Sequence, residues 1–280
     1  MGDNPRLSQV LIDNLRPIGQ TMALLILGVF IWWGCSSDMI EPLLKSNISG
    51  SFSILVHLLA SGSKFLAIIL AMAIVWYTII RPSNRNHTFC NGNIYHDYPY
   101  WWFLFCAKFL RYKKCNLMRI PIHTQFLLVI QTVFDEFDIP DSSFPKENFE
   151  AEVVVIQNIK EKNNEYNLIL EDTYPITESQ LPVEKRELYT VKIKHKNKNN
   201  NLRIFNKQFV KKVCETVRSF PDGITINLYA TTNPKHNYEI ARQAFALGDR
   251  GNVQQLNVYQ QDGKEPRKFQ SYKKVYVRNK

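Results

Sequence analysis

The chain has 280 residues and a formal net charge of +10. Four basic and four acidic residues precede Arg81, so the whole positive excess lies from Arg81 onward, in a stretch long enough for one packed domain. The five cysteines are odd in number and scattered, which argues against a disulfide framework and is typical of a reducing compartment. The basic stretch fits a lipid surface, a nucleotide or nucleic-acid partner, or an ordinary lysine-rich surface in solvent.

Two apolar segments are the first predicted elements in chain order. They run from Ile18 to Trp33 and from Phe65 to Ile80. With a few flanking residues, each reaches the roughly 17–20 residues that a helix needs to cross a bilayer. We therefore expect two transmembrane helices joined by an external loop at about residues 36–63.

Aromatic and basic residues flank both segments, as membrane-anchored helices require. Tryptophan concentrates at the headgroup level, and lysine and arginine reach that level along their aliphatic stems. The expected interface residues are Trp32, Trp33, Lys64, Trp76, Arg81, Trp101, Trp102, Lys108 and Arg111. Basic residues after the second segment outnumber those in the connecting stretch, which predicts that both termini lie in the cytoplasm.

Two alternatives bear on this membrane arrangement. Gly34–Cys35 resembles the end of a lipoprotein signal, but the two tryptophans before it are too bulky for a cleavage site, and a second apolar segment follows. Ser53 to Ala60 is expected to lie at the outer interface or to re-enter the bilayer slightly. Alternatively, one long helix runs from Phe52 to Ile80 and places Lys64 inside the bilayer, at a cost of about 3 kcal/mol on insertion scales.

Residues 81–148 are predicted to connect the membrane segments to a folded domain. Residues 81–93 are predicted to be a polar linker, because Pro82, Gly92 and four asparagines disfavour regular structure. Residues 98–115 are aromatic and end in basic side chains, which is typical of a helix lying on an anionic membrane surface; an amphipathic helix packed on the domain is the alternative. Thr124 to Asp138 is expected to be a second apolar helix that following prolines stop.

From residue 149 the pattern alternates between strands and helices. The predicted strands are Glu152–Ile156, Tyr166–Leu170, Tyr189–Lys194, Leu202–Phe205, Ile224–Ala230, Val253–Tyr259 and Tyr272–Val277, and the predicted helices are Lys207–Phe220 and Lys235–Leu247. This order is typical of an open sheet, so the expected fold is a membrane α-helical hairpin followed by a cytoplasmic, Rossmann-like α/β domain. The expected boundaries are 1–17 for a cytoplasmic N-terminus, 18–80 for the hairpin, 81–148 for the linker and juxtamembrane helices, and 149–280 for the α/β domain.

The end of the strand Ile224–Ala230 is the most informative place for a ligand. In open α/β sheets, ligands bind beyond the carboxyl ends of the strands. The residues at this end, which open the next helix, are Thr231, Thr232, Asn233, Pro234 and Lys235. Free N–H groups in the first turn of that helix, together with the lysine, suit a phosphate. The alternative is that Thr232 or Asn233 only caps the helix.

The stretch INLYATTNPKHNYEIARQAFALG, with the later strand LNVYQ, resembles the C-terminal part of SAVED domains, which are relatives of the CARF sensors. NLILEDTYPI and QFVKKVCETVRSF fit the same order, and residues 149–280 resemble one half of such a two-part domain. The resemblance implies a sensor of cyclic oligonucleotides in prokaryotic antiviral signalling, as in CBASS or type III CRISPR systems, fused to membrane helices as the effector. The residues that match its ligand loop are Thr231 to Lys235, and Gly248 and Arg250 follow the helix.

The same resemblance implies the partners and the location. They are the lipid bilayer, a cyclic nucleotide second messenger as activating ligand, and further copies of the chain, because a single half needs a second copy to close around a ring. We expect a two-span protein of the cell inner membrane with no cofactor, and nucleic acid is not an expected partner. The alternative is a non-enzymatic anchor in a conjugation or secretion machine, whose basic domain would hold proteins or DNA.

The sequence gives little support to catalytic or metal chemistry. It has no Walker-type phosphate loop, no GxGxxG and no recognisable nucleophile–base pair, so we predict that the protein is not an enzyme. His87, Cys90 and His96 are too weakly spaced to predict a metal site. Glu171 and Asp172 follow a strand end, as catalytic acids can, but they serve equally well to cap the following turn.

Overall fold

The computed structural model of the chain describes residues 14–34, 54, 64–140, 143–147, 150–157, 164–196, 203–246 and 251–278. These residues fall into two compact units. The described residues within 14–94 and 101–115 are termed the hairpin unit, and those within 95–100 and 116–278 the sheet unit.

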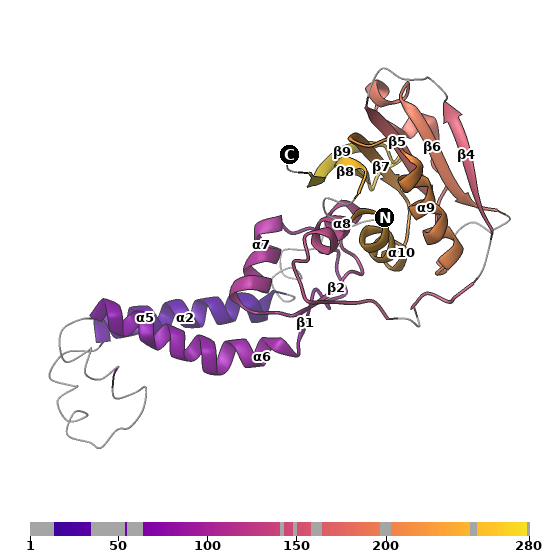
Figure 1. Ribbon diagram of the computed structural model, residues 1–280. Helices are drawn as coiled ribbons and strands as arrows, with labels where there is room; N and C mark the ends of the chain where they lie inside the picture. Colours follow the sequence, from indigo (N-terminus) through magenta and orange to yellow (C-terminus); the bar gives the residue numbers. More distant parts are fainter. Residues whose placement is uncertain are drawn as a thin grey trace. The chain divides into compact units, whose positions relative to one another are not determined.

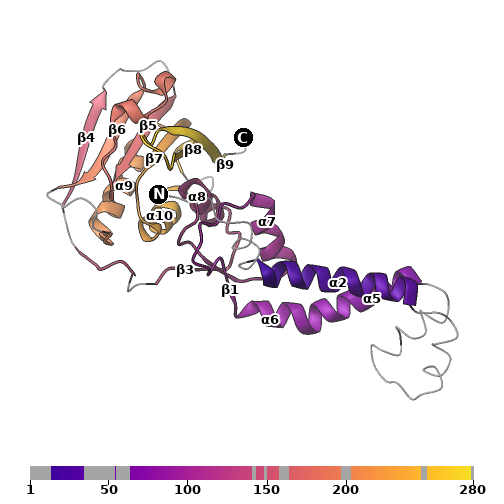
Figure 2. The same cartoon turned by 180° about the vertical axis from the view of Figure 1, so that it is seen from behind.

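Two long helices form most of the hairpin unit. The first is α2 (Leu15–Gly34); the second runs continuously through α5 (Lys64–Val75), the π-helical turn η1 (Trp76–Ile80) and α6 (Arg81–Arg85). They lie side by side (Figures 1 and 2). By length and composition, Leu15–Trp33 and Lys64–Arg85 are able to cross a membrane. Both apolar segments are therefore helices as predicted, whereas the prediction for Ser53–Ala60 lies outside the described residues, Ile54 excepted.

Small side chains allow the two helices to approach closely. Ala67 and Ala71 on α5 are buried, and a Cβ placed on Gly28 of α2 would lie 3.5 Å from the Cγ2 of Ile68. Small residues are the usual contacts between membrane helices. Many exposed side chains of α2 and α5 are large and apolar, which suits a lipid environment: they include Leu25, Ile26, Val29, Phe30, Phe65, Leu66 and Ile69.

The prediction of an irregular linker at 81–93 is wrong for its first part, because the helix continues to Arg85. Proline within a helix lacks an N–H and crowds the carbonyl four residues before it. The π-helical turn η1 ends two residues before Pro82, and the Arg81 N–H bonds to the carbonyl of Trp76, five residues earlier, instead of four as in an α-helix. Beyond the helix, β1 (Thr88–Phe89) pairs in parallel with β2 (Lys114–Asn116).

The aromatic stretch predicted to be helical over 98–115 is helical over a shorter range. It consists of α7 (Tyr100–Leu104) and the π-helical η2 (Phe105–Phe109). Arg111 has a φ of 64°, a left-handed conformation that ends the helix. Phe103 and Cys106 are fully buried, whereas Trp101 is 63% exposed. The helix is therefore amphipathic, which both alternatives for this stretch require.

The second apolar helix, α8 (Ile122–Ile130), is shorter than the predicted helix that extends to Asp138. Thr132 has a φ of 45°, which ends it, and β3 (Glu136–Asp138) follows. Val133 and Phe134 are buried without being helical. The apolar pattern therefore continues past the end of the helix, and for this reason the pattern alone predicts a helix that is too long.

A six-stranded sheet forms the core of the sheet unit (Figure 1). Its spatial order is β4 (Ala151–Gln157), β6 (Tyr189–His195), β5 (Glu165–Glu171), β7 (Ile224–Ala230), β8 (Val253–Gln261) and β9 (Phe269–Val277). The four inner strands are parallel, and β4 and β9 are antiparallel edges. Six predicted strands are confirmed. The seventh, Leu202–Phe205, is wrong for its described residues, since Phe205 forms only an isolated bridge with Lys146.

Helices cover one face of this sheet, and a loop covers the other. α9 (Lys207–Ser219), α10 (Pro234–Ile240) and its π-helical continuation η6 (Ala241–Phe245) pack with α8 on the first face, so both predicted helices are confirmed. The chain between β5 and β6 covers the second face and contains the short turns η4 (Glu178–Gln180) and η5 (Val183–Lys185). Its Ile176 and Leu181 cluster with Ile169 and Tyr229 of the sheet. Both faces are therefore buried, as is usual for parallel sheets.

Candidate functional site at the carboxyl edge of the sheet

The strand order creates a topological switch point between β5 and β7. The chain passes from β5 to β6 on one side and then crosses to β7 on the other side of β5. Ligands of doubly wound sheets bind beyond the carboxyl ends of the strands at such a point. The two loops are joined there, because Thr231 N–H donates to the Leu170 carbonyl at 3.0 Å and Thr173 N–H donates to the Thr231 carbonyl at 3.1 Å. The residues following β7 that were predicted to bind a ligand thus begin at the switch point.

A buried carboxylate lies at this edge. Asp172 Oδ1 is 3.0 Å from Nε2 of His195 at the end of β6, and Oδ2 is 2.7 Å from Nδ1 of His236 in α10. The side-chain and backbone N–H groups of Asn233 lie 3.0 and 3.3 Å from Oδ2. All three side chains of the Asp–His–His group are at most 2% exposed. Together with Asn206 and Asn233, this group is termed the Asp172 network.

The protonation of the two histidines follows from their other partners. The backbone N–H of Asn206 donates to His236 Nε2 at 2.9 Å, so the proton of His236 is on Nδ1, facing Asp172. Asn206 Oδ1 accepts from the N–H of Gln208, which turns the Asn206 amide nitrogen toward His195 Nδ1 at 3.1 Å. His195 therefore carries its proton on Nε2. On this assignment from hydrogen-bond partners, two neutral imidazoles donate to one ionised carboxylate.

The composition of the Asp172 network is that of a metal site, and its three ligand-type atoms lie within 4.8 Å of one another. Its hydrogen bonds indicate another role. A metal needs the lone pairs of the ring nitrogens, and the two nitrogens that face the carboxylate carry protons in this arrangement. The network instead joins β5, β6, α9 and α10 through fully paired polar groups, which fixes the geometry of the edge.

Added zinc is accordingly expected to leave the thermal stability of the full chain unchanged. A metal that binds the native network at a hundred times its Kd would add about 2.7 kcal/mol to the free energy of unfolding. Thermal unfolding of the full chain in detergent, with zinc and with a chelator, measures the effect. A zinc-dependent rise in the unfolding midpoint that is lost in His236→Gln would show that the network binds metal.

The first residues of the predicted ligand loop are buried among protein partners. Thr231 Oγ1 donates to the Tyr174 carbonyl at 2.7 Å, and Thr232 Oγ1 donates to Asn237 Oδ1. Both threonines are 6% exposed. Their side chains therefore hold the loop in place in this structure.

The remaining loop residues differ in how far they reach solvent. Asn233 Oδ1 accepts from His236 N–H at 3.0 Å, so the helix-cap alternative is confirmed for Asn233, and that N–H is not free for a phosphate. Pro234 and Lys235 are half-buried at the start of α10. Gly248 and Arg250 lie outside the described residues. Of the loop residues that the structure describes, Pro234 and Lys235 are thus the most accessible.

An aromatic ring and a lysine lie together at this edge. Phe205 is half-buried, and its ring centroid is 5.8 Å from Lys235 Nζ and 5.4 Å from the ring centroid of His236. Three exposed basic residues adjoin Phe205, two in sequence and one through its backbone bridge: Arg203, Lys207 and Lys146. Phe205, Lys235, Arg203, Lys207 and Lys146 are termed the basic–aromatic rim. The rim therefore lies directly against the Asp172 network.

Sequence reasoning missed the importance of Phe205, His195 and His236. Phe205 was assigned to a strand, although Asn206 before an amphipathic helix is a recognisable cap, and its side chain does accept from Gln208 N–H. That cap was the signal that the residue before it lies in a loop at the helix start. Nothing in the sequence indicated that the two histidines, 41 positions apart, share one carboxylate.

The other polar residues singled out from the sequence have structural partners. Glu171 Oε2 accepts hydrogen bonds from the Ile176 N–H at 2.8 Å and from Lys192 at 3.0 Å, so it caps the turn after β5, as one alternative predicted. In the part of the chain that the structure describes, the metal-type cluster is the Asp172 group and does not include His87, Cys90 or His96.

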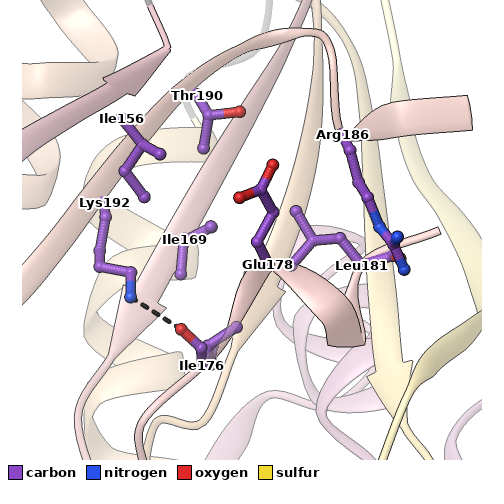
Figure 3. Close-up of a pocket in the computed structure, with 8 residues that line it drawn as sticks. All are labelled: Ile156, Ile169, Ile176, Glu178, Leu181, Arg186, Thr190 and Lys192. Carbon is purple, nitrogen blue, oxygen red and sulfur yellow. Dashed lines mark hydrogen bonds between the residues drawn. The ribbon is translucent and has the colours of Figure 1, made fainter. Parts of the chain in front are cut away.

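A separate pocket opens on the loop-covered face of the sheet (Figure 3). It is lined by Ile156, Ile169, Ile176, Glu178, Leu181, Arg186, Thr190 and Lys192. Lys192 Nζ donates across it to the Ile176 carbonyl at 2.7 Å. Its volume of about 30 Å³ holds only a few water molecules and excludes a nucleotide.

Two long apolar helices and a doubly wound sheet with a switch-point edge define a two-helix α/β protein. A family model described as SUa-2TM, the SMODS- and Ubiquitin system-associated 2TM effector domain, matches residues 6–277. The chain belongs to this family.

Solved structures similar to the chain include SAVED/CARF-domain receptors. The Cap4 receptor of Acinetobacter baumannii with the cyclic trinucleotide 2'3'3'-cAAA has a TM-score of 0.39 and 11% identity, over 57% of this chain and 38% of that chain. The Cap4 receptor of Moraxella osloensis has a TM-score of 0.36 and 13% identity, over 59% and 36%. The chain thus spans less than two fifths of these receptors, and no curated protein matches it. The family match confirms the predicted relationship to membrane effectors with two transmembrane helices.

Proposed function

We propose that the protein is an effector of prokaryotic antiviral defence that binds a cyclic oligonucleotide through its sheet unit and then disrupts a membrane with its two apolar helices. Membership of a 2TM effector family supports the effector role. The observation that carries the binding role is the Phe205–Lys235 pair, an aromatic ring with an ammonium 5.8 Å from its centroid, at the switch-point edge. This pair offers one surface for a base and one charge for a phosphate.

The chemistry of the rim suits a nucleotide ring. Bases stack on aromatic side chains regardless of sequence, and lysine and arginine neutralise the backbone. Phe205 would stack with one base, while Lys235, Arg203 and Lys207 would contact phosphates. Thr231, Thr232 and Asn233 would then act by positioning the loop from inside. Gly248 and Arg250, which the resemblance assigns to the ligand, remain predicted contacts.

The proposed assembly follows from the exposed position of the rim. A single copy offers one such edge, and a ring-shaped ligand has several phosphates and bases, so a second copy would close the site. We propose a non-enzymatic homo-oligomer of the inner membrane, with both termini in the cytoplasm, the bilayer as the target and no cofactor. Ligand binding can trigger the helices only through different affinities for the resting and active assemblies.

Phe205→Ala is expected to weaken binding of the activating ring by about 10- to 100-fold, because one base–aromatic stack contributes roughly 1–3 kcal/mol. Lys235→Ala is also expected to weaken binding, because a charged contact with a phosphate is lost. Binding of cyclic di-, tri- and tetranucleotides to the full chain in detergent measures this. The matched control is Arg242→Ala, which removes a similar pair, since Arg242 Cζ lies 5.2 Å from the Tyr238 ring centroid in α10–η6. A ring that binds both rim variants with unchanged affinity would refute the rim as the site.

A further inference from the structure

A fully buried asparagine lies near the end of the second apolar helix. Asn84, in α6, is 0% exposed. Its Oδ1 accepts from Gln20 Nε2 at 2.8 Å and from Arg16 Nε at 3.2 Å. Its Nδ2 donates to Gln20 Oε1 at 2.7 Å and to the Leu110 carbonyl at 2.8 Å. These four bonds use both donors and both lone pairs of one carboxamide.

Arg16 extends this contact between the two apolar helices. Its Nη2 donates to the Oγ of Ser83 at 2.6 Å and to the Ser83 carbonyl at 3.1 Å. Arg16 and Gln20 are four residues apart and therefore lie on one face of α2. The four residues Arg16, Gln20, Ser83 and Asn84 are termed the polar latch. They join the start of α2 to the end of α6 by directional bonds.

The aromatic helix α7–η2 is bonded to the same two helices. The last carbonyls of a helix have no partner within it. Here the second apolar helix supplies partners for two of them: Trp76 Nε1 donates to the Phe109 carbonyl at 2.7 Å, and Asn84 donates to the Leu110 carbonyl. At the other end, Trp102 Nε1 donates to Asn14 Oδ1 at 3.0 Å, one residue before α2. A shift of the aromatic helix would therefore strain or break the hydrogen bond between Asn84 of the polar latch and the Leu110 carbonyl.

The rest of the described helix–helix contact is of a different kind. Leu24 and Ile31 on α2, and Ala67 and Ala71 on α5, are buried there without directional bonds from their side chains. In a bilayer such apolar contacts resemble contacts with lipid tails, so they set the register of two helices weakly. A paired polar group in the same place fixes register, as a buried asparagine does in coiled coils.

We propose that the polar latch is a regulatory device that holds the two apolar helices in a silent arrangement and releases them when the aromatic helix moves. The chain continues from Leu110 through β2 into the sheet unit, so the aromatic helix lies on one of the covalent connections between the two units. When the Leu110 carbonyl is withdrawn, an Asn84 N–H loses its partner, which weakens the whole carboxamide pair. This device rests on the proposed function for its output, the disruption of a membrane.

Asn84→Leu removes all four bonds at similar side-chain volume. In the full chain reconstituted into dye-filled liposomes, it is expected to raise ligand-independent dye release at least about tenfold, because the latched arrangement loses its interhelical bonds. Gln20→Leu is expected to act in the same direction. The matched control is Thr21→Val, because Thr21 Oγ1 donates only within α2, to the Pro17 carbonyl at 2.8 Å. The control is expected to leak no more than the unmodified chain.

A second variant tests the opposite direction and does not depend on a destabilised hairpin. In Gln20→Cys/Asn84→Cys, a short reducible bis-thiosulfonate replaces the lost amide pair by a covalent link. Linked protein is expected to lose triggered dye release and to regain it on reduction, with the unmodified chain treated in parallel as the reagent control. If Asn84→Leu and Gln20→Leu leak no more than the unmodified chain, or if linked protein still releases dye when triggered, the latch is refuted.

The same assay separates this device from the proposed ligand. If no cyclic nucleotide triggers the unmodified chain but Asn84→Leu leaks, the latch is supported and the ligand proposal fails. If a cyclic nucleotide triggers the unmodified chain and Asn84→Leu is as tight as the control, the ligand proposal stands and the latch is refuted.

Discussion

Asp172→Asn is expected to lower the free energy of unfolding of the sheet unit by about 3 kcal/mol or more. The substitution keeps the shape of the side chain but replaces one acceptor oxygen by an NH2 donor. Both carboxylate oxygens face donors, His195 on one side and His236 with Asn233 on the other. Either orientation of the new amide therefore sets two donors against each other in a fully buried site.

Amide hydrogen exchange of β5 and β7 in the full chain measures this loss. All five tryptophans lie in the hairpin unit, so tryptophan fluorescence would report on the wrong unit. A loss of 3 kcal/mol speeds globally limited exchange by roughly a hundredfold. The matched control is Glu152→Gln, because Glu152 forms a half-exposed pair with Lys194 at 3.6 Å and is expected to change stability by under about 0.5 kcal/mol. Equal exchange in both variants would mean that the Asp172 network does not support the edge.

Phe209→Ala is expected to cost about 3–5 kcal/mol of stability, as large-to-small changes of buried aromatics do. Phe209 is 0% exposed on α9. Its ring stacks on His195 at a centroid distance of 4.5 Å and lies 5.2 Å from His236. The cavity would therefore open beside both imidazoles and weaken the hydrogen bonds to Asp172. Because the two sites touch, the effects of Phe209→Ala and Asp172→Asn should not add.

Pulse proteolysis of the full chain in increasing urea measures this second effect. Lys211→Ala on the exposed side of the same helix is the control, since its pair with Glu215 is long, at 3.8 Å, and solvent-exposed. The control is expected to unfold at the urea concentration of the unmodified chain. If Phe209→Ala unfolds there as well, the α9 contact with the histidines contributes nothing measurable to the edge.

The strands were predictable because each inner strand carries a local apolar signal. Tyr166–Leu170 and Ile224–Ala230 needed no knowledge of their neighbours, and the structure extends the first by one residue at each end. Helix ends were harder to predict. α8 ends where Thr132 adopts a left-handed conformation. The second apolar helix continues through Pro82 to Arg85, after the π-helical turn at Trp76–Ile80. Both are backbone conformations that an apolar pattern does not encode.

The location of the candidate site in the fold was predictable from the sequence, but the side chains that form it were not. The end of β7 marked the switch-point edge, because the general rule for α/β sheets applies to any such order. Which side chains point inward there depends on long-range packing. Asp172, His195 and His236 come from three elements, and their hydrogen bonds leave Phe205 and Lys235 at the accessible side. The polar latch was invisible for the same reason, since Gln20 and Asn84 are 64 residues apart.

Dye release from liposomes that contain the unmodified full chain, with a panel of cyclic di-, tri- and tetranucleotides and their linear counterparts, tests the proposed function most directly. One ring should trigger release, its linear form should not, and Phe205→Ala or Lys235→Ala should need a higher concentration of that ring while Arg242→Ala responds normally. Absence of release with every ring, from protein shown to be folded and inserted, would contradict the proposal. Binding of DNA that falls steeply with salt would then favour an anchored structural component instead.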